Sequence, residues 1–146
     1  MRMTTRFQFF DLKTPADLFR KLEGDLAALE ASYQDTRIAF NFFVTAEHLP
    51  DWLGKRDLIR QDAFLKIVSH IASGAKHFNL DDPRHHSVTS TEKSRYMEEG
   101  YIERGYYHEP LLIHLSPDEA REMNTPTIDA VTLGRQVIEF WRQHIP

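Results

Sequence analysis

Two groups of polar residues have types and spacings suited to chemistry. His48 and Asp51 lie three residues apart in an otherwise apolar stretch, and Lys76 and His77 stand side by side at the end of another. Histidine serves as a general acid or base near neutral pH, and lysine stabilises the negative charge that develops on a phosphodiester. We predict a catalytic site with His77 as the general acid or base, Lys76 as the charge stabiliser, and His48 and Asp51 as the orienting pair.

These side chains share helix faces with other polar residues. Asn41, Thr45 and His48 recur at spacings of four and three residues, which places them on one face of a helix. His70, Ser73 and His77 lie on one face of the next helix by the same rule. A buried polar group without a partner costs roughly 1 to 3 kcal/mol, so both faces need partners. We therefore hypothesise that the two polar faces meet at a cleft.

The histidines raise the alternative of a divalent-metal site. Neutral imidazole binds zinc, nickel or iron, which makes His48, His70 and His77, with Asp51, a candidate ligand set. His70 and His77 are seven residues apart, about 10.5 Å along an ideal helix. One ion reaches both only if the helix breaks at Gly74. We therefore assign no metal and no cofactor.

Two other interpretations need no catalysis. In the first, Lys76 and His77 stabilise the carboxyl end of a helix dipole at about 0.3 to 1 kcal/mol per charge, and His48 and Asp51 form a hydrogen-bonded pair that closes a helix. In the second, the surface around residues 79–95 and the β element after them binds a protein partner. That partner is either another protein or a second copy of the chain, so the alternative function is a non-enzymatic interaction or dimerisation module.

The composition limits the class of protein. With 146 residues, 41% of them hydrophobic, the chain fits one domain with a real core. Eighteen basic and 22 acidic residues give a net charge of -4, so the whole domain has no strong attraction to nucleic acid. No cysteine is present, which excludes disulfides and thiolate chemistry. No signal-peptide core and no apolar run of about 18 residues is present, so we predict a cytoplasmic protein without a membrane partner.

The first two predicted helices differ in their apolar patterns. An amphipathic helix over 15–33 begins at the N-cap Thr14. Residues 37–53 are apolar on almost every face, which places that helix in the middle of a bundle. We expect a kink or an end near Leu49, because Pro50 removes a backbone hydrogen bond.

Two further helices flank a β element. The third runs from Asp57 to about Ala75 or His77 and has a core face of Phe64, Ile67, Val68, Ile71 and Ala75. An irregular loop follows at about 79–95. A small two-stranded unit follows at about 96–116, with LLIHL as one strand, and a turn-rich loop with one short helical turn comes next. Thr127 caps the last helix, whose core stripe is Val131, Ile138, Trp141 and Ile145.

These elements predict a mainly α fold. We expect residues 1–146 to form a single domain, an antiparallel four-helix bundle with a small β-hairpin inserted before the last helix.

Several phrases of the sequence resemble a known group of proteins. FNFFVTAEHLPDWL, HIASGAKHF, NLDDPRH and VIEFW look like a family of small bacterial and phage-associated helical proteins, over about residues 36–144. The phrases HLPDW and SGAKHF are the core of the likeness. This resemblance implies a shared helical fold more than a reaction.

More remotely, four helices with a histidine at the end of the third are similar to HEPN domains, many of which are metal-independent ribonucleases in toxin and phage-defence systems. The resemblance implies RNA as the substrate and His77 as the catalytic residue. Active HEPN nucleases place an arginine four to six intervening residues before that histidine. Here those positions hold Ala72, Ile71 and His70. The resemblance therefore implies that Lys76 or Arg84 supplies the cation, or that the chain is a binding-only relative.

Overall fold

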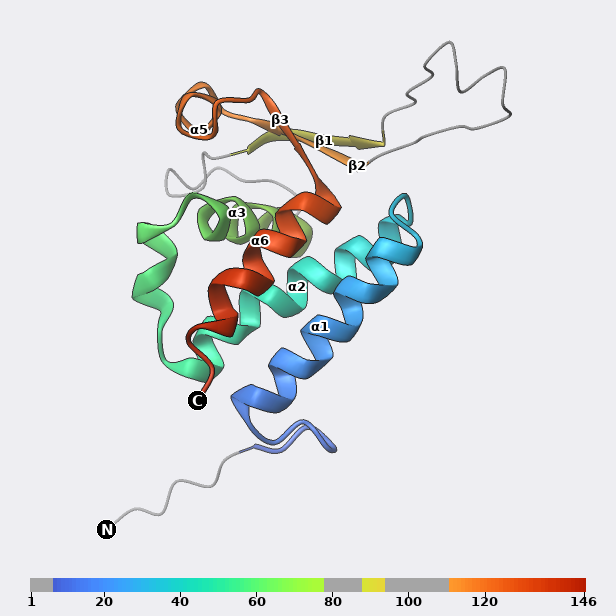
Figure 1. Cartoon of the computed structure of the whole chain (residues 1–146), viewed down its shortest axis with the longest axis vertical. Coiled ribbons are helices and arrows are strands. Elements are labelled where there is room, and N and C mark those ends of the chain that lie inside the picture. The colour runs from blue at the N-terminus through green and yellow to red at the C-terminus, as the bar shows by residue number, and fades with distance from the viewer. Residues whose placement is uncertain (1–6, 78–87, 94–110) are drawn as a thin grey trace.

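The structure of the protein, a computed structural model, describes residues 7–77, 88–93 and 111–146 (Figure 1). It is mainly helical and carries a small three-stranded antiparallel sheet. No helix in the described ranges is long and apolar enough to cross a membrane. Predictions for other positions, among them Arg84 and much of the stretch 79–116, lie outside the described residues.

The first helix, α1 (Pro15–Ala31), begins at the predicted cap. The Asp17 amide donates to the Thr14 hydroxyl at 3.1 Å, and the Thr14 amide donates to the Asp17 carboxylate at 3.0 Å. This reciprocal pair satisfies two amides that no helical carbonyl can reach. A short turn leads from α1 to α2 (Thr36–Leu53), and the two helices lie side by side in opposite directions (Figure 1).

Helix α2 continues past Pro50. Of the kink or end predicted near Leu49, the end is therefore wrong, and the kink stays a prediction. Proline costs the helix one backbone hydrogen bond. The ring of Pro50 is fully buried, and that burial offsets part of the loss. The helix ends at Leu53 because Gly54 follows with φ of 66°, a left-handed conformation that glycine adopts without strain.

The predicted third helix is divided into two, so the prediction of one helix from Asp57 is wrong. A 3-10 helix, η1 (Arg56–Gln61), comes first, and α3 (Ala63–His77) follows. Asp62 between them has an extended backbone, and its carboxylate accepts a hydrogen bond from the Leu65 amide at 3.1 Å. This local cap starts a new helix.

The buried face of α3 agrees with the predicted one at Ile67 and Val68 and differs at the other predicted positions. Phe64 and Ile71 are only half-buried, and Ala75 is exposed. The buried residues are Leu65, Ile67, Val68, Ser69, His70 and Ala72.

Strand β2 (Leu111–Leu115) is the strand predicted from LLIHL, and it is the centre of the sheet. It pairs antiparallel with β1 (Val88–Lys93) on one side and with β3 (Thr127–Asp129) on the other. β1 lies inside the irregular loop predicted at 79–95, so that prediction is wrong for these residues. The other strand predicted before β2, within 96–110, lies outside the described residues.

A short helix and β3 precede the last helix. The helix α5 (Pro117–Met123) occupies the predicted turn-rich loop. Thr127 lies in β3, so its prediction as the cap of the last helix is wrong. Asp129 caps α6 (Ala130–Arg142) instead, and its carboxylate accepts a hydrogen bond from the Thr132 amide at 2.9 Å.

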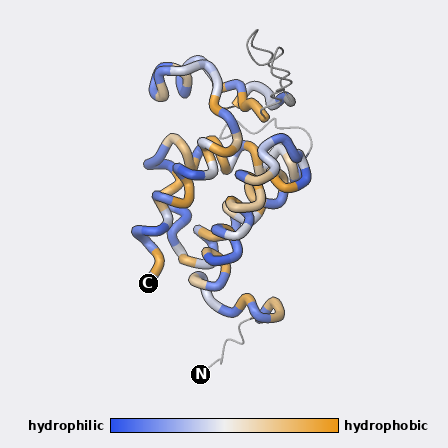
Figure 2. Tube along the Cα trace, turned by 45° about the vertical axis from the view of Figure 1, so that its right-hand side comes forward, coloured by the Kyte–Doolittle hydropathy of each residue, from blue (hydrophilic) through white to orange (hydrophobic). Residues whose placement is uncertain are grey.

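The core lies between the helices and the inner face of the sheet. Hydrophobic and hydrophilic residues alternate along each helix (Figure 2), as amphipathic packing requires. α6 packs against α1, α2 and α3. Of its predicted stripe, Ile138 and Trp141 are buried, whereas Val131 and Ile145 are half-buried.

Candidate functional site

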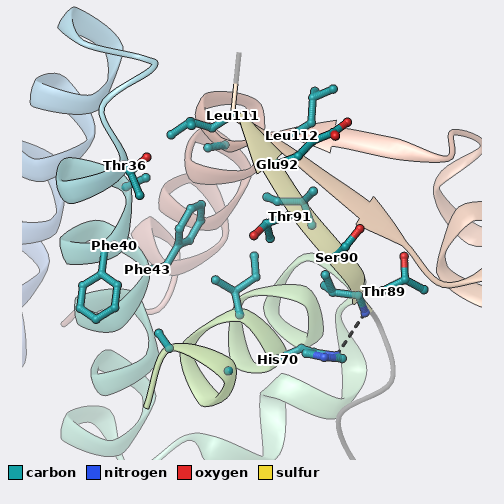
Figure 3. A pocket seen from close by; sticks show the side chains of 17 residues that line it. Thr36, Phe40, Phe43, His70, Thr89, Ser90, Thr91, Glu92, Leu111 and Leu112 are labelled. Carbon is teal, nitrogen blue, oxygen red and sulfur yellow. Dashed lines mark hydrogen bonds between the residues drawn. The ribbon is translucent and has the colours of Figure 1, made fainter. Parts of the chain in front are cut away.

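Helices α2 and α3, two strands of the sheet and the first residue of α6 line an open pocket of about 810 Å³ (Figure 3). α2 contributes the rings of Phe40 and Phe43. α3 contributes His70 and Ile71, and the sheet contributes five of the six residues of β1 and residues 111–113 of β2. Phe43 and Thr91 face one another across the space (Figure 3). The pocket therefore runs along a strand and has an apolar wall opposite it.

The strand that lines this pocket is an edge of the sheet. β2 pairs with one edge of β1, and no other strand in the described part of the chain pairs with its second edge. Thr89, Ser90, Thr91 and Glu92 are all exposed. An edge strand presents backbone N–H and C=O groups that can pair with a further strand.

His70 joins α3 to this edge. The Val88 amide donates to Nδ1 of His70 at 3.1 Å, as the dashed line in Figure 3 marks. Nδ1 accepts this bond through its lone pair, so the ring donates only from Nε2. The sequence predicts His70 on a polar face at a cleft, whereas the structure buries it and gives it a backbone partner.

The predicted polar face of α2 meets α1. Nζ of Lys21 donates to Thr45 Oγ1 at 2.9 Å and to Asn41 Oδ1 at 3.2 Å. The same ammonium group forms an ion pair with Asp25 Oδ2 at 2.5 Å. Asn41 and Thr45 therefore have their partners on α1, not in a cleft between α2 and α3.

Asp51 has a cationic partner near the end of α2. Nη1 of Arg56 lies 3.3 Å from Asp51 Oδ2, and Nη2 of Arg56 lies 2.6 Å from Glu47 Oε1. Burial disfavours the charged guanidinium, but the hydrogen bond to Glu47 and the charges of Glu47 and Asp51 outweigh it, so the pKa of Arg56 is raised. Ser69 of α3 also donates to Glu47, at 3.1 Å. This cluster joins α2, η1 and α3.

The other predicted catalytic residues are exposed. Lys76 and His77 lie in the last turn of α3, and His48 lies on the surface of α2. Within the part of the chain that the structure describes, no hydrogen bond or ion pair joins these three side chains to one another. Phe40 shares the pocket with the end of α3, and His48 lies eight residues further along α2, about 12 Å on an ideal helix. The catalytic roles of these residues stay predictions.

The metal alternative finds no ligand cluster in the described ranges. There, no three histidine, aspartate or glutamate side chains gather where they could hold an ion. Of the predicted ligands, His70 already accepts a hydrogen bond from Val88, and Asp51 pairs with Arg56.

The sequence predictions missed the two components that define the pocket. Phe40 and Phe43 belong to a stretch that is apolar on almost every face, and the strand VTSTEK lies inside the predicted loop. β-branched valine and threonine residues favour strands, which is the signal that could have identified β1.

Comparisons with family models, with curated proteins and with solved structures find no match to this chain. The candidate site therefore rests on its geometry, and the likeness to HEPN domains stays a prediction.

Proposed function

We propose that the protein is a cytoplasmic, non-enzymatic interaction module that binds an extended peptide segment in the pocket between α2, α3 and β1. The observation that carries the proposal is that this pocket follows an edge strand over almost its whole length. Edge strands bind peptides by adding a strand, with backbone hydrogen bonds supplying affinity and adjoining pockets selecting side chains.

The size and the walls of the pocket support this proposal. A volume of about 810 Å³ lies within the range of about 300 to 1,000 Å³ in which proteins bind ligands. Phe40 is 54% exposed, so a large apolar surface is available beside the strand. A bound side chain would cover it and remove apolar surface from water.

The framework of the proposal is the predicted four-helix bundle. The contacts of α6 with α1, α2 and α3 support that arrangement. In it, the strands before α6 form the third wall of the pocket.

The test starts from a phage-displayed library of 12-residue peptides, selected on the wild-type protein. Selected peptides are then synthesised with single backbone N-methyl groups, and their affinities are measured by fluorescence anisotropy. Pairing with β1 predicts that methylation weakens binding at alternate positions, because successive amides of a strand point to opposite sides. Failure to select any peptide, or a loss that lacks this alternation, contradicts strand addition.

Two exposed aromatic residues of α2 provide a matched pair of variants. Phe40 lines the pocket, whereas Trp52, 38% exposed, does not. We expect Phe40→Ser to weaken peptide binding about tenfold or more and Trp52→Ser to change it less than about twofold. Equal effects of the two substitutions would place the peptide elsewhere.

A second proposal, a HEPN-like ribonuclease, is supported by one observation. Lys76 and His77 are exposed directly after Gly74 and Ala75, which line the pocket, so RNA at the pocket mouth would reach them. Wild type and His77→Ala are incubated with total RNA and a chelator. The proposal expects cleavage that the substitution abolishes, and equal, negligible cleavage by both proteins rejects it.

A further inference from the structure

The bonds of β2 determine which way the backbone of β1 points. In an antiparallel sheet, the N–H and C=O groups of successive residues point alternately to one neighbouring strand and to the other. The Leu115 amide donates to the Pro126 carbonyl at 3.0 Å, on the side of β3. Ile113, two residues earlier in β2, therefore also directs its backbone groups to β3. Leu112 and His114 then direct theirs to β1.

This alternation leaves the backbone of Thr91 at the free edge of the sheet. Leu112 lies opposite Glu92, and His114 lies opposite Ser90. Ser90 and Glu92 therefore direct their backbone groups to β2. Thr91 stands between them, so its N–H and C=O point away from β2.

His70 limits where an added strand can pair. The Val88 amide donates to Nδ1 of His70 at 3.1 Å, so it points away from β2 and is already bonded. β1 ends at Lys93. Between these limits, Thr91 offers both of its backbone groups to an incoming segment.

The side chain of Thr91 faces the pocket. Residues directly opposite each other on paired strands point to the same face of the sheet. Thr91 lies opposite Ile113, which is buried in the core, and Figure 3 shows Thr91 directed at Phe43. Glu92 lies on the outer face, where it bonds to His114. Thr91 therefore combines a backbone at the free edge with an inward side chain.

We propose that the bound peptide adds antiparallel to β1, and that its residue opposite Thr91 both pairs with Thr91 and fills the pocket with a large apolar side chain. This inference rests on the proposed function, because it names the class of peptide that the same pocket binds. In an antiparallel pair, two opposite residues can exchange both backbone bonds, and their side chains share a face. The sheet is antiparallel at both of its pairings, and antiparallel pairing is slightly more stable per residue than parallel pairing.

The walls of the pocket select the side chain at that position. Phe40 is 54% exposed and Ile71 is half-buried, and both line the pocket. An apolar side chain placed against them removes the apolar surface of both partners from water. The neighbouring residues of the peptide point to the outer face, beside Ser90 and Glu92, where polar side chains stay solvated. The partner is therefore an extended segment of another protein in which large apolar and polar residues alternate.

Two scans of the phage-selected peptides test this inference. Single N-methyl groups identify the amides that bond to β1, and single serine substitutions identify the side chains that enter the pocket. We expect both changes to weaken binding about tenfold or more at the same positions, and less than about twofold at the positions between them. In parallel pairing, Thr91 would bond the two residues that flank its opposite residue, so the two sets of positions would alternate.

The outcomes of these scans separate the inference from the proposed function. If the two sets of positions alternate, or if the serine substitutions have no effect at the N-methyl-sensitive positions, the inference is overturned and strand addition stands. If the N-methyl groups show no alternation at all, both are overturned.

Amide exchange measured by NMR tests the orientation of β1 without a substitution. In the free protein, Thr91 should exchange faster than Ser90 and Glu92, because only their amides point to β2. Saturation with a selected peptide should slow exchange about tenfold or more at Thr91 and change it less than about twofold at Ser90 and Glu92. Slowing at Ser90 and Glu92 but not at Thr91 would overturn the inference and leave strand addition standing. A bound peptide that slows none of the three would overturn both.

Discussion

Lys21 determines how the polar positions of α2 are satisfied. Its ammonium group contacts Asp25, Asn41 and Thr45, although only the first of these lies on its own helix. Asn41 is 20 residues away and Thr45 is 24 residues away along the chain. The spacing of the polar residues identified their shared face, but a single sequence does not state which neighbouring helix covers it.

We predict that Lys21→Met lowers the free energy of unfolding by about 1 to 3 kcal/mol, because it leaves the buried Thr45 hydroxyl and its neighbours without a donor. The double variant Lys21→Met/Thr45→Val should recover part of that loss, since the buried hydroxyl is then gone. Urea unfolding followed by circular dichroism gives both values. Arg20→Met is the control. The exposed Arg20 pairs with Asp17 at the surface, and an ion pair of this kind contributes about 0 to 1 kcal/mol to the free energy of unfolding. A loss for Lys21→Met no larger than that of the control contradicts this role.

Asp17 makes the first turn of α1 sensitive to acid. The Lys13 amide donates to its carboxylate at 2.9 Å, and this bond is the largest influence on its titration. Partial burial opposes it, but the bonds from Thr14 and Arg20 add to it, so the pKa of Asp17 lies below its ordinary value of 3.8. A lowered pKa in the folded state means that the carboxylate stabilises the fold above pH 3.8 and loses this effect as the pH falls through the folded value.

The substitution Asp17→Asn tests this dependence. The urea midpoints of wild type and variant should differ by a constant amount above about pH 5. Below pH 3.8 the difference should shrink, because wild type then also loses its charge at this position. A difference that stays constant down to pH 2 would show that the charge of Asp17 does not contribute.

At the scale of elements, the predictions succeeded where the signals are local. Thr14 and Asp17 both lie at the start of α1, and their hydrogen bonds form within one turn. Thr127 and Asp129 are both suitable helix caps by type. Thr127 is unavailable as a cap because it pairs opposite His114 in the sheet. That pairing joins residues far apart in the sequence, so periodicity near Thr127 does not reveal it.

The pocket could not be predicted for the same reason, because it depends on the pairing of two strands that are separated in the sequence. β1 is polar, and its partner strand follows only after residues 94–110. Without that strand, neither the exposed Phe40 nor the half-buried Ile71 has a recognisable role. His70 was predicted to face a cleft, but its actual partner is a backbone amide of β1.

We predict that His70→Phe loosens β1 from α3. Phenylalanine keeps a ring of similar size but offers no acceptor to the Val88 amide. Amide hydrogen exchange measured by NMR should accelerate about tenfold at Val88, because a local opening becomes easier. His70→Asn retains an acceptor near the same position and should exchange more slowly than His70→Phe. The control His114→Phe alters the outer face of the sheet, where His114 pairs with Glu92, and should leave Val88 unchanged. Equal exchange in all four proteins would show that the bond does not hold the strand.

At the scale of the whole molecule, α6 connects the sheet to the helices. It begins at the end of β3 and packs against α1, α2 and α3, so its position fixes where the strands stand relative to the pocket. Gly134 is the point of closest approach. A Cβ atom there would lie 3.0 Å from Leu26 Cδ1 of α1 and 3.2 Å from Phe42 Cε1 of α2.

A second helical glycine makes this approach measurable. A Cβ atom at Gly24 of α1 would meet nothing within 4 Å. Gly24→Ala should raise the free energy of unfolding by about 0.5 to 1 kcal/mol, because alanine loses less backbone entropy in a helix. Gly134→Ala gains the same term but must also push apart the buried side chains of Leu26 and Phe42, at about 1 to 3 kcal/mol. Urea unfolding of both variants gives the difference between their free energies of unfolding. The gain from placing alanine in a helix is common to both, so the difference reports the crowding at Gly134. If Gly134→Ala is as stable as Gly24→Ala, α6 can shift without a loss of stability. The sheet that precedes α6 and lines the pocket can then shift with it. If Gly134→Ala is less stable by the expected amount, the three helices fix α6, and the edge of β1 faces α2 and α3 as a rigid surface ready for an incoming strand.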